Sequence, residues 1–209
     1  MKIGIIGATG KAGGLILKEA LGRNLDVTAI VRNGKKLTDN KVPFIEKDLF
    51  SLTKVDLAVF EVVVDAFSSP LNAVHLHLES IKHLAGLVSG TKTRLIAIGG
   101  AGSLYVDEEK TVQFKDTDMF PAEFKPLSTA GANSLNYLKA TQNLHWTVIS
   151  PPVQFEFEGE KTGNYVITGE VLTKSENGKS RISYADYAIA LVDEIINSKY
   201  DKQRIGVRD

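Results

Sequence analysis

Gly7-Ala8-Thr9-Gly10-Lys11-Ala12-Gly13 is the stretch that decides the fold of this chain. The apolar run Lys2-Ile3-Gly4-Ile5-Ile6 precedes it, and apolar residues at helical spacing follow it. A buried strand that turns through glycines into a helix directs the free N–H groups of the first helical turn at one point, which attracts phosphate. Gly7 suits the tight turn, Gly10 the close approach of a pyrophosphate, and Gly13 the close packing of helix on strand.

The next apolar run, Asp26-Val27-Thr28-Ala29-Ile30-Val31, is typical of the second parallel strand of a βαβ unit. The glycine turn therefore follows a strand, opens a helix and leads to another strand, which is the context of dinucleotide binding. The alternative is a turn that serves packing and binds nothing. We predict that the turn binds a dinucleotide, with Thr9, Lys11 and Ala12 contributing beside the three glycines.

The glycine pattern also carries a resemblance to a known family. Its first gap is one residue longer than in the Gly-x-Gly-x-x-Gly of ordinary dehydrogenases. In this spacing the chain resembles atypical short-chain dehydrogenases/reductases, specifically NmrA-type proteins and NAD(P)H-dependent flavin or biliverdin reductases. The resemblance runs nearly end to end, through Asp65–Phe67, Ile98–Leu104, Trp146–Pro152 and Ile182–Ala188. It implies an α/β doubly wound parallel sheet, the Rossmann fold, and a nicotinamide cofactor.

Composition limits the classes of function. A length of 209 residues with 43% hydrophobic content suits one domain with a substantial core. Lys plus Arg and Asp plus Glu balance at 25 each, so no overall field favours nucleic acid or an anionic membrane as a partner. The absence of cysteine excludes disulfides, thiol nucleophiles and thiolate metal sites. The chain begins directly with a core strand and contains no run of transmembrane length, so we predict a cytoplasmic protein.

Strand and helix patterns alternate along the chain without a linker or an internal repeat, as a doubly wound sheet requires. We therefore predict a single domain, 1–209, with substrate-side elements at about 103–126 and 151–182. Further strands are expected at 43–47, 61–67, 94–98, 145–150 and 203–207. Helices are expected from near residue 51 and at 71–88, 127–143 and 184–197.

Two local signals concern the C-terminal third. Asn177-Gly178 lies between extended runs at 165–172 and 179–182, which predicts a β-hairpin. Ser183-x-x-Asp186 resembles a capping box that opens the last helix, so Asp186 is interpreted as a cap and not as a catalytic acid.

The loop after the second strand, Arg32-Asn33-Gly34-Lys35-Lys36, bears on the choice of cofactor. Enzymes that prefer NAD place an acidic side chain near the end of this strand, whereas an arginine accommodates the 2′-phosphate of NADP. No Asp or Glu lies between Val27 and Lys36, so Arg32 favours NADP, the alternative being a solvated basic turn. Lys11 could reach the same phosphate or lie exposed in the first helical turn.

The remaining candidate residues follow later strands, whose carboxyl ends line the ligand crevice of an open α/β sheet. Ala66-Phe67, at the carboxyl end of the fourth strand, belongs to this crevice. The resemblance implies that Asp48-Leu49 meets the adenine, although Asp48 is equally suited to cap the next helix. It further implies that Gly99-Gly100 approaches the nicotinamide ribose and that Pro151 lies at the carboxamide.

Catalytic and metal-binding residues are less evident. In ordinary short-chain dehydrogenases the helix expected at 127–143 bears Tyr-x-x-x-Lys, in which tyrosine is the general acid and lysine lowers its pKa. Here Thr141 lies four residues after Tyr137, and Lys139 lies on another face, so the dyad is absent and no catalytic residue is assigned. His75 and His77 fall on different sides of their helix, unlike the ligands of a helical zinc site, and we expect no metal.

Two functions fit this cofactor site. The first is an NADPH-dependent reductase of a flat conjugated acceptor, such as a free flavin, a quinone or a tetrapyrrole, which needs orientation more than a positioned acid. The second is a non-catalytic NADP(H) sensor of NmrA type that binds a partner protein. Phe120 and Phe124, in the irregular segment 103–126, would cover the acceptor or merely pin a surface loop. We favour the reductase because the chain is short and shows no appended recognition domain.

Overall fold

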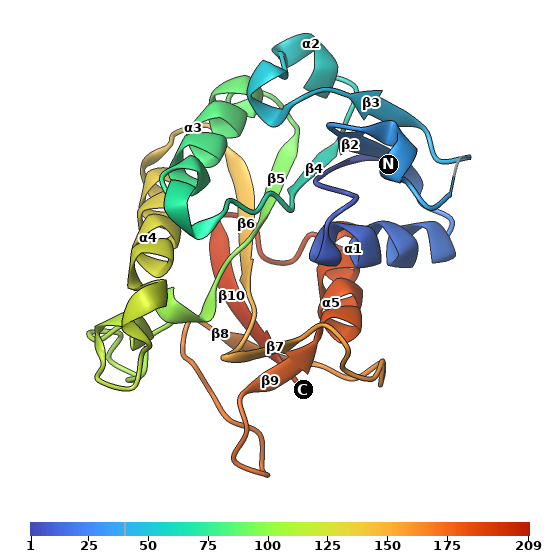
Figure 1. Ribbon diagram of the computed structural model, residues 1–209. Helices are drawn as coiled ribbons and strands as arrows, with labels where there is room; N and C mark the ends of the chain where they lie inside the picture. The colour runs from blue at the N-terminus through green and yellow to red at the C-terminus, as the bar shows by residue number, and fades with distance from the viewer. Residues whose placement is uncertain (40) are drawn as a thin grey trace.

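The computed structural model, which describes residues 1–39 and 41–209, is a sheet covered by helices on both faces (Figure 1). Its strands are β1 (Lys2–Ile6), β2 (Asp26–Val31), β3 (Phe44–Glu46), β4 (Val62–Asp65), β5 (Arg94–Ile98), β6 (His145–Ser150), β7 (Gln154–Glu156), β8 (Val166–Gly169), β9 (Arg181–Ser183) and β10 (Gln203–Arg208). Its α-helices are α1 (Lys11–Gly22), α2 (Lys54–Leu57), α3 (Leu76–Val88), α4 (Lys125–Ala140) and α5 (Tyr184–Asn197).

The main sheet has the strand order β3-β2-β1-β4-β5-β6-β10-β8. From β3 to β10 the neighbouring strands pair in parallel, and β8 runs antiparallel to β10. The chain builds outward from β1 to β3 and then returns to place β4 on the other side of β1. Such a reversal opens a crevice at the carboxyl ends of the strands, where open α/β sheets bind ligands. The predicted doubly wound parallel sheet is confirmed.

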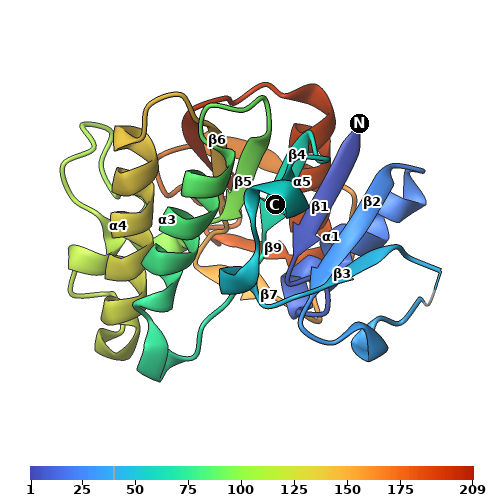
Figure 2. The same ribbon diagram turned by 90° about the horizontal axis from the view of Figure 1, so that it is seen from above.

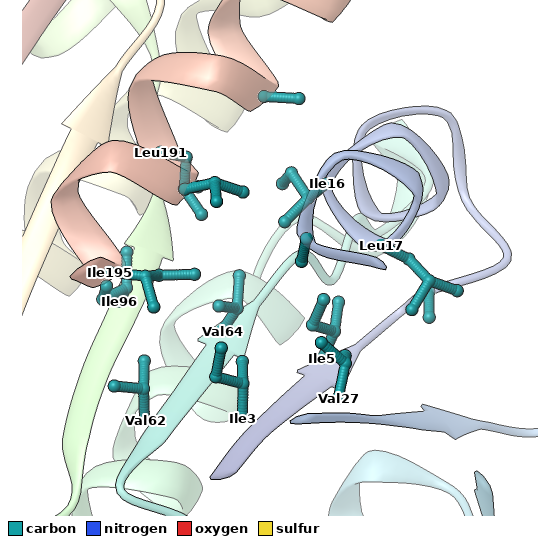
Figure 3. Packing of buried hydrophobic residues seen from close by; sticks show 14 of the residues in the cluster. Ile3, Ile5, Ile16, Leu17, Val27, Val62, Val64, Ile96, Leu191 and Ile195 are labelled. Carbon is teal, nitrogen blue, oxygen red and sulfur yellow. The ribbon is translucent and has the colours of Figure 1, made fainter. Parts of the chain in front are cut away.

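Two apolar layers hold the helices on the sheet. Figure 3 shows the layer under α1 and α5, where side chains of both helices meet those of the strands: Ile3, Ile5, Ile16, Leu17, Val27, Val62, Val64, Ile96, Leu191 and Ile195. On the opposite face α3 and α4 lie side by side (Figure 2), and their Leu84 and Leu138 pack with Leu95 and Trp146 of the sheet. Because the inner strands are buried on both faces, their sequences are continuous apolar runs.

The predicted hairpin around Asn177-Gly178 is wrong. The turn itself forms, with Gly178 at φ +78° and the Ser175 N–H donating to the Lys179 carbonyl over 2.8 Å. The flanking strands pair elsewhere: β8 joins the free edge of β10, and β9 pairs in parallel with β7 in a separate two-stranded sheet. An edge strand offers unpaired backbone groups to any extended segment nearby, and a local turn signal does not reveal which segment takes them.

Several predicted boundaries also shift. The helix expected near residue 51 is a 3₁₀ turn, Leu49–Ser51, followed by α2, which Thr53 caps. The range 71–88 begins with another 3₁₀ turn, Leu71–Ala73, before α3. Helix α4 starts before Pro126, because proline is tolerated in a first helical turn, where its missing N–H has no partner to lose.

Within residues 1–39 and 41–209, no helix combines the length and the apolar character needed to cross a membrane.

Candidate dinucleotide site

The glycine turn joins β1 to α1 with little space to spare. Gly7 has φ +75°, a conformation that favours glycine, and a Cβ there would lie 2.7 Å from the Ala66 carbonyl oxygen. A Cβ on Gly13 would overlap the Gly7 carbonyl group, so α1 reaches this close to β1 only because position 13 lacks a side chain. The predicted roles of these two glycines in the turn and in packing agree with this geometry.

Gly10 is less crowded than Gly7 and Gly13. Its backbone is extended, with φ −82°, and a Cβ there would meet only the Gly7 carbonyl oxygen, at 3.2 Å. A Cβ at position 10 would therefore meet less of the protein than a Cβ at position 7 or 13. The open space above Gly10 fits the predicted approach of a pyrophosphate.

The start of α1 suits an anion. No side chain caps the helix at Gly10, and its first turn contains no acidic residue. The positive end of the helix and its free N–H groups therefore face outward without a built-in negative partner. Thr9 and Lys11 are exposed beside this end. The arrangement fits the phosphates of a dinucleotide, which would be held by the backbone N–H groups together with Thr9 and Lys11.

The end of β4 lies directly against the glycine turn. The Ala66 N–H donates to the Ile6 carbonyl over 3.1 Å, which brings Ala66 and Phe67 beside Gly7. Asp65, buried at the end of β4, accepts a hydrogen bond of 3.0 Å from the Phe67 N–H. Burial raises the pKa of Asp65 to about 6, against the opposing effect of the hydrogen bonds from Phe67 and Ser80. Asp65 is the only charged residue of β4, and the sequence analysis gave it no role.

The basic loop after β2 is held by a residue that the sequence analysis missed. Glu46, the last residue of β3, accepts a hydrogen bond of 2.7 Å from the Gly34 N–H, and Asn33 accepts one from the Lys35 N–H. Arg32 is exposed and forms no ion pair with any residue that the structure describes. Its guanidinium group is therefore available to an external anion. Only the parallel pairing of β2 and β3 brings Glu46 here, which no local pattern could indicate.

Of the two roles predicted for Asp48, capping and contact with the adenine, the structure shows the cap. Its carboxylate accepts a hydrogen bond of 3.0 Å from the Phe50 N–H and caps the 3₁₀ turn that begins at Leu49. Leu49 is buried in the core beneath this turn. The contact with the adenine that the resemblance implied stays a prediction for both residues.

The ends of β5 and β6 complete the carboxyl edge. The Gly99 N–H donates to the Ile149 carbonyl over 2.8 Å, and a Cβ on Gly99 would overlap the Ser150 hydroxyl. A Cβ on Gly100 would meet nothing within 4 Å, so this backbone is open on its outer side. Pro151, directly after β6, is buried. Tyr187 of α5 also fixes this corner, because its buried hydroxyl donates to the Ile149 carbonyl over 2.7 Å.

The predicted site residues thus follow six neighbouring strands, β1 to β6. Parallel strands bring their carboxyl ends to one edge of a sheet, so these residues share one side of the molecule. That each of them contacts a cofactor stays a prediction.

Comparison with known proteins agrees with this geometry. Residues 7–195 match the NAD(P)H-binding family. YwnB, an uncharacterized protein of Bacillus subtilis (strain 168), is 44% identical over 208 residues, covering 99% of this chain and 98% of its own. A crystal structure from Streptococcus pneumoniae TIGR4, provisionally named an NADH-flavin reductase, is 48% identical with a TM-score of 0.94, covering 100% of this chain and 99% of that one. A crystal structure from Bacteroides thetaiotaomicron, provisionally named an epimerase, is 29% identical with a TM-score of 0.84. The match covers 99% of this chain and 96% of that one.

The fold, the glycine turn and these relatives together define the class, an NAD(P)H-dependent oxidoreductase built on a Rossmann fold. The chain belongs to the NAD(P)H-binding family. The resemblance to NAD(P)H-dependent reductases expected from the sequence is confirmed, and so is the nicotinamide cofactor.

Proposed function

We propose that this protein transfers hydride from NADPH to a flat conjugated acceptor, such as a free flavin, a quinone or a tetrapyrrole. The provisional name of the Streptococcus pneumoniae relative, an NADH-flavin reductase, supports an acceptor of this kind. The exposed Arg32 and the absence of an acidic side chain in its loop support NADPH over NADH.

The observation that carries the proposal is the apolar character of the carboxyl edge. Four large apolar side chains in the segments after β4, β5 and β6 are exposed: Leu71, Met119, Phe124 and Val153. Segments that follow neighbouring parallel strands begin at one edge of the sheet, and exposed apolar side chains in them suit a surface that binds an apolar ligand. They come from the proposed substrate-side elements at about 103–126 and 151–182, together with the 3₁₀ turn before α3.

The segment 103–126 is better ordered than its sequence suggested. It contains 3₁₀ turns at Phe114–Asp116 and Ala122–Phe124, and Phe114 is buried. Phe120 packs edge-on against Phe114, with 5.2 Å between ring centroids, so this ring pins the segment. Phe124 is half-exposed and, with Met119, remains available to an acceptor.

When bound, NADPH supplies the hydride, so the chain has to bind, orient and shield the two reactants. Reduction of a flavin or quinone takes its proton from water, and no positioned acid is required. Tyr137 is partly buried against the core, and Lys139 pairs with Glu170 over 3.3 Å. Neither side chain has the partner that a Tyr-x-x-x-Lys mechanism needs.

Arg32→Ala is expected to weaken NADPH binding by about ten to a hundredfold and to leave NADH binding nearly unchanged. A charge-assisted contact with the 2′-phosphate contributes about 1.5 to 3 kcal/mol, and NADH lacks this phosphate. Titration calorimetry with both cofactors measures the difference, and Lys36→Ala removes an equal charge from the same loop as a control. Equal losses for both cofactors in Arg32→Ala would assign Arg32 to the loop and not to the phosphate.

Tyr137→Phe and Lys139→Ala are each expected to keep the turnover number within about threefold of the wild type. Loss of a general acid costs about a hundredfold or more, so this comparison is decisive. Steady-state kinetics with a saturating acceptor gives the turnover number, and thermal melting verifies folding. A hundredfold loss in a folded Tyr137→Phe variant that still binds NADPH would identify a tyrosine acid.

The proposal is tested by a panel of acceptors, namely FMN, menadione and biliverdin, each assayed with NADPH and with NADH. We expect protein-dependent oxidation of NADPH with at least one acceptor. If the protein binds NADPH but none of the three acceptors oxidises it, the NADP(H) sensor is favoured. Isomerisation of a sugar nucleotide with retention of bound NAD would favour the epimerase chemistry for which one relative is named.

A further inference from the structure

The segment Phe157–Gly163, here called the strap, lies between β7 and β8 and contacts α1 at two points. The Lys161 ammonium group donates to the Glu19 carboxylate over 2.7 Å. The Lys11 ammonium group lies 5.0 Å from the centroid of the Phe157 ring, within the range of a cation–π interaction. Lys11 opens α1 beside Gly10, so the strap reaches the mouth of the candidate dinucleotide site.

Asp186, in the first turn of α5, holds the other side of the strap. Its carboxylate accepts hydrogen bonds from the Thr162 N–H over 3.0 Å, the Thr162 hydroxyl over 2.8 Å and the Gly163 N–H over 2.8 Å. Asp186 is only 1% exposed. A buried carboxylate has to be satisfied by donors, and here the strap supplies them.

This assignment changes the role predicted for Asp186 as a capping residue. The hydroxyl of Ser183 does accept from the Asp186 N–H over 2.9 Å, so Ser183 caps α5 as predicted. The Asp186 carboxylate makes no return bond to the cap and points to Thr162 and Gly163. The strap also passes close to the start of α5, since a Cβ on Gly159 would lie 2.8 Å from the Ser183 Cβ.

Phe157 is the side chain that the strap presents to the site. Its ring packs edge-on against Tyr184, with 5.6 Å between centroids, and Tyr184 stacks on Phe155 at 3.6 Å. Despite these contacts Phe157 is 47% exposed. A large ring that is supported on one side and open on the other, next to Lys11, is placed to cover a ligand on the glycine turn.

We propose that the strap is a further binding element of the dinucleotide site, with Phe157 covering the bound cofactor beside Lys11 and Asp186 acting as the positioning residue. The proposal rests on the proposed function for the location of the cofactor. It adds three contributors, Phe157, Thr162 and Asp186, that lie outside the glycine turn. Asp186 itself does not touch the cofactor, because its oxygens are occupied by the strap.

The test combines two variants with one control. Asp186→Asn keeps the size of the side chain but loses an acceptor oxygen for the strap, and Phe157→Ala removes a half-exposed ring whose loss leaves the core intact. Val166→Ala removes a side chain of similar exposure, 43%, from β8 as the control. We expect Asp186→Asn and Phe157→Ala each to weaken NADPH binding by about tenfold, and Val166→Ala to leave it unchanged.

Lys161, whose side chain is 55% exposed, offers a trypsin site in the strap, and the protection of this site by NADPH is a readout that a purely structural role would not change. In the wild type, NADPH should slow this cleavage, because a cofactor covered by the strap keeps the strap closed. In Asp186→Asn, cleavage should be faster and NADPH should protect little.

The outcomes separate the two proposals. If the wild type binds NADPH and both variants bind it equally well without loss of protection, the role of the strap is overturned and the proposed function stands. If the wild type does not bind NADPH, the proposed function and this inference both fail. If Asp186→Asn does not fold, Phe157→Ala alone decides.

Discussion

Gly10→Val is expected to abolish NADPH binding, with a loss of at least about a hundredfold in affinity, in a protein that still folds. The backbone at Gly10 is extended, which valine adopts readily, and a Cβ there would meet only the Gly7 carbonyl oxygen, at 3.2 Å. The valine methyl groups would then occupy the space proposed for the pyrophosphate. Titration with NADPH and thermal melting measure the two effects.

Gly13→Ala and Gly22→Ala are matched controls on the same helix. A Cβ on Gly13 would overlap the Gly7 carbonyl group, so Gly13→Ala should lower the melting temperature strongly. A Cβ on Gly22 would meet nothing within 4 Å, so Gly22→Ala should not lower the melting temperature and should leave binding unchanged. A folded Gly10→Val variant that binds NADPH normally would remove the glycine turn from the cofactor site.

Asp65→Asn is expected to remove a loss of stability of up to about 3 kcal/mol that the wild type undergoes as pH rises. Burial raises the pKa of Asp65 from 3.8 to about 6, so the folded protein holds this proton more tightly than the unfolded chain. The free energy of unfolding of the wild type therefore falls as pH rises from about 4 to about 6 and loses no more from this group above that range. Asparagine does not ionise and avoids this loss.

The measurement is urea denaturation of the wild type and of Asp65→Asn at about pH 4 and pH 7. The free energy of unfolding of the variant minus that of the wild type should be larger at about pH 7 than at about pH 4. The other titrating groups contribute equally to both proteins and cancel in this difference. Asp48→Asn, which alters an exposed carboxylate, provides the control. If the two proteins differ in free energy of unfolding by the same amount at both pH values, the raised pKa of Asp65 is contradicted.

Much of the fold follows from local sequence patterns. The glycine turn and the apolar run before it predict β1, α1 and the parallel sheet, because a strand buried on both faces leaves few other architectures. Helix α5 has the predicted bounds, since Ser183 caps it and apolar residues recur along it. At the candidate site, the strand ends that carry Ala66, Gly99 and Pro151 lie at the predicted edge.

What local patterns miss depends on contacts between distant segments. The pairing of β8 with β10 replaces the predicted hairpin, although its turn forms at Gly178. Glu46 anchors the basic loop only because β3 lies beside β2. The carboxylate of Asp186 finds its donors in Thr162, more than twenty residues upstream. A cap signal identifies the start of a helix but not the partners that a buried side chain meets after the chain has folded.

The most direct test of the central claim is anaerobic incubation of NADPH and FMN with a catalytic amount of the protein, while the nicotinamide and flavin absorbances are followed together. As a reductase of flat acceptors, the protein should oxidise NADPH and reduce FMN mole for mole, faster with NADPH than with NADH, and Gly10→Val should do neither. A wild-type protein that binds NADPH tightly but leaves both absorbances unchanged, with FMN and with menadione, would contradict the proposed function.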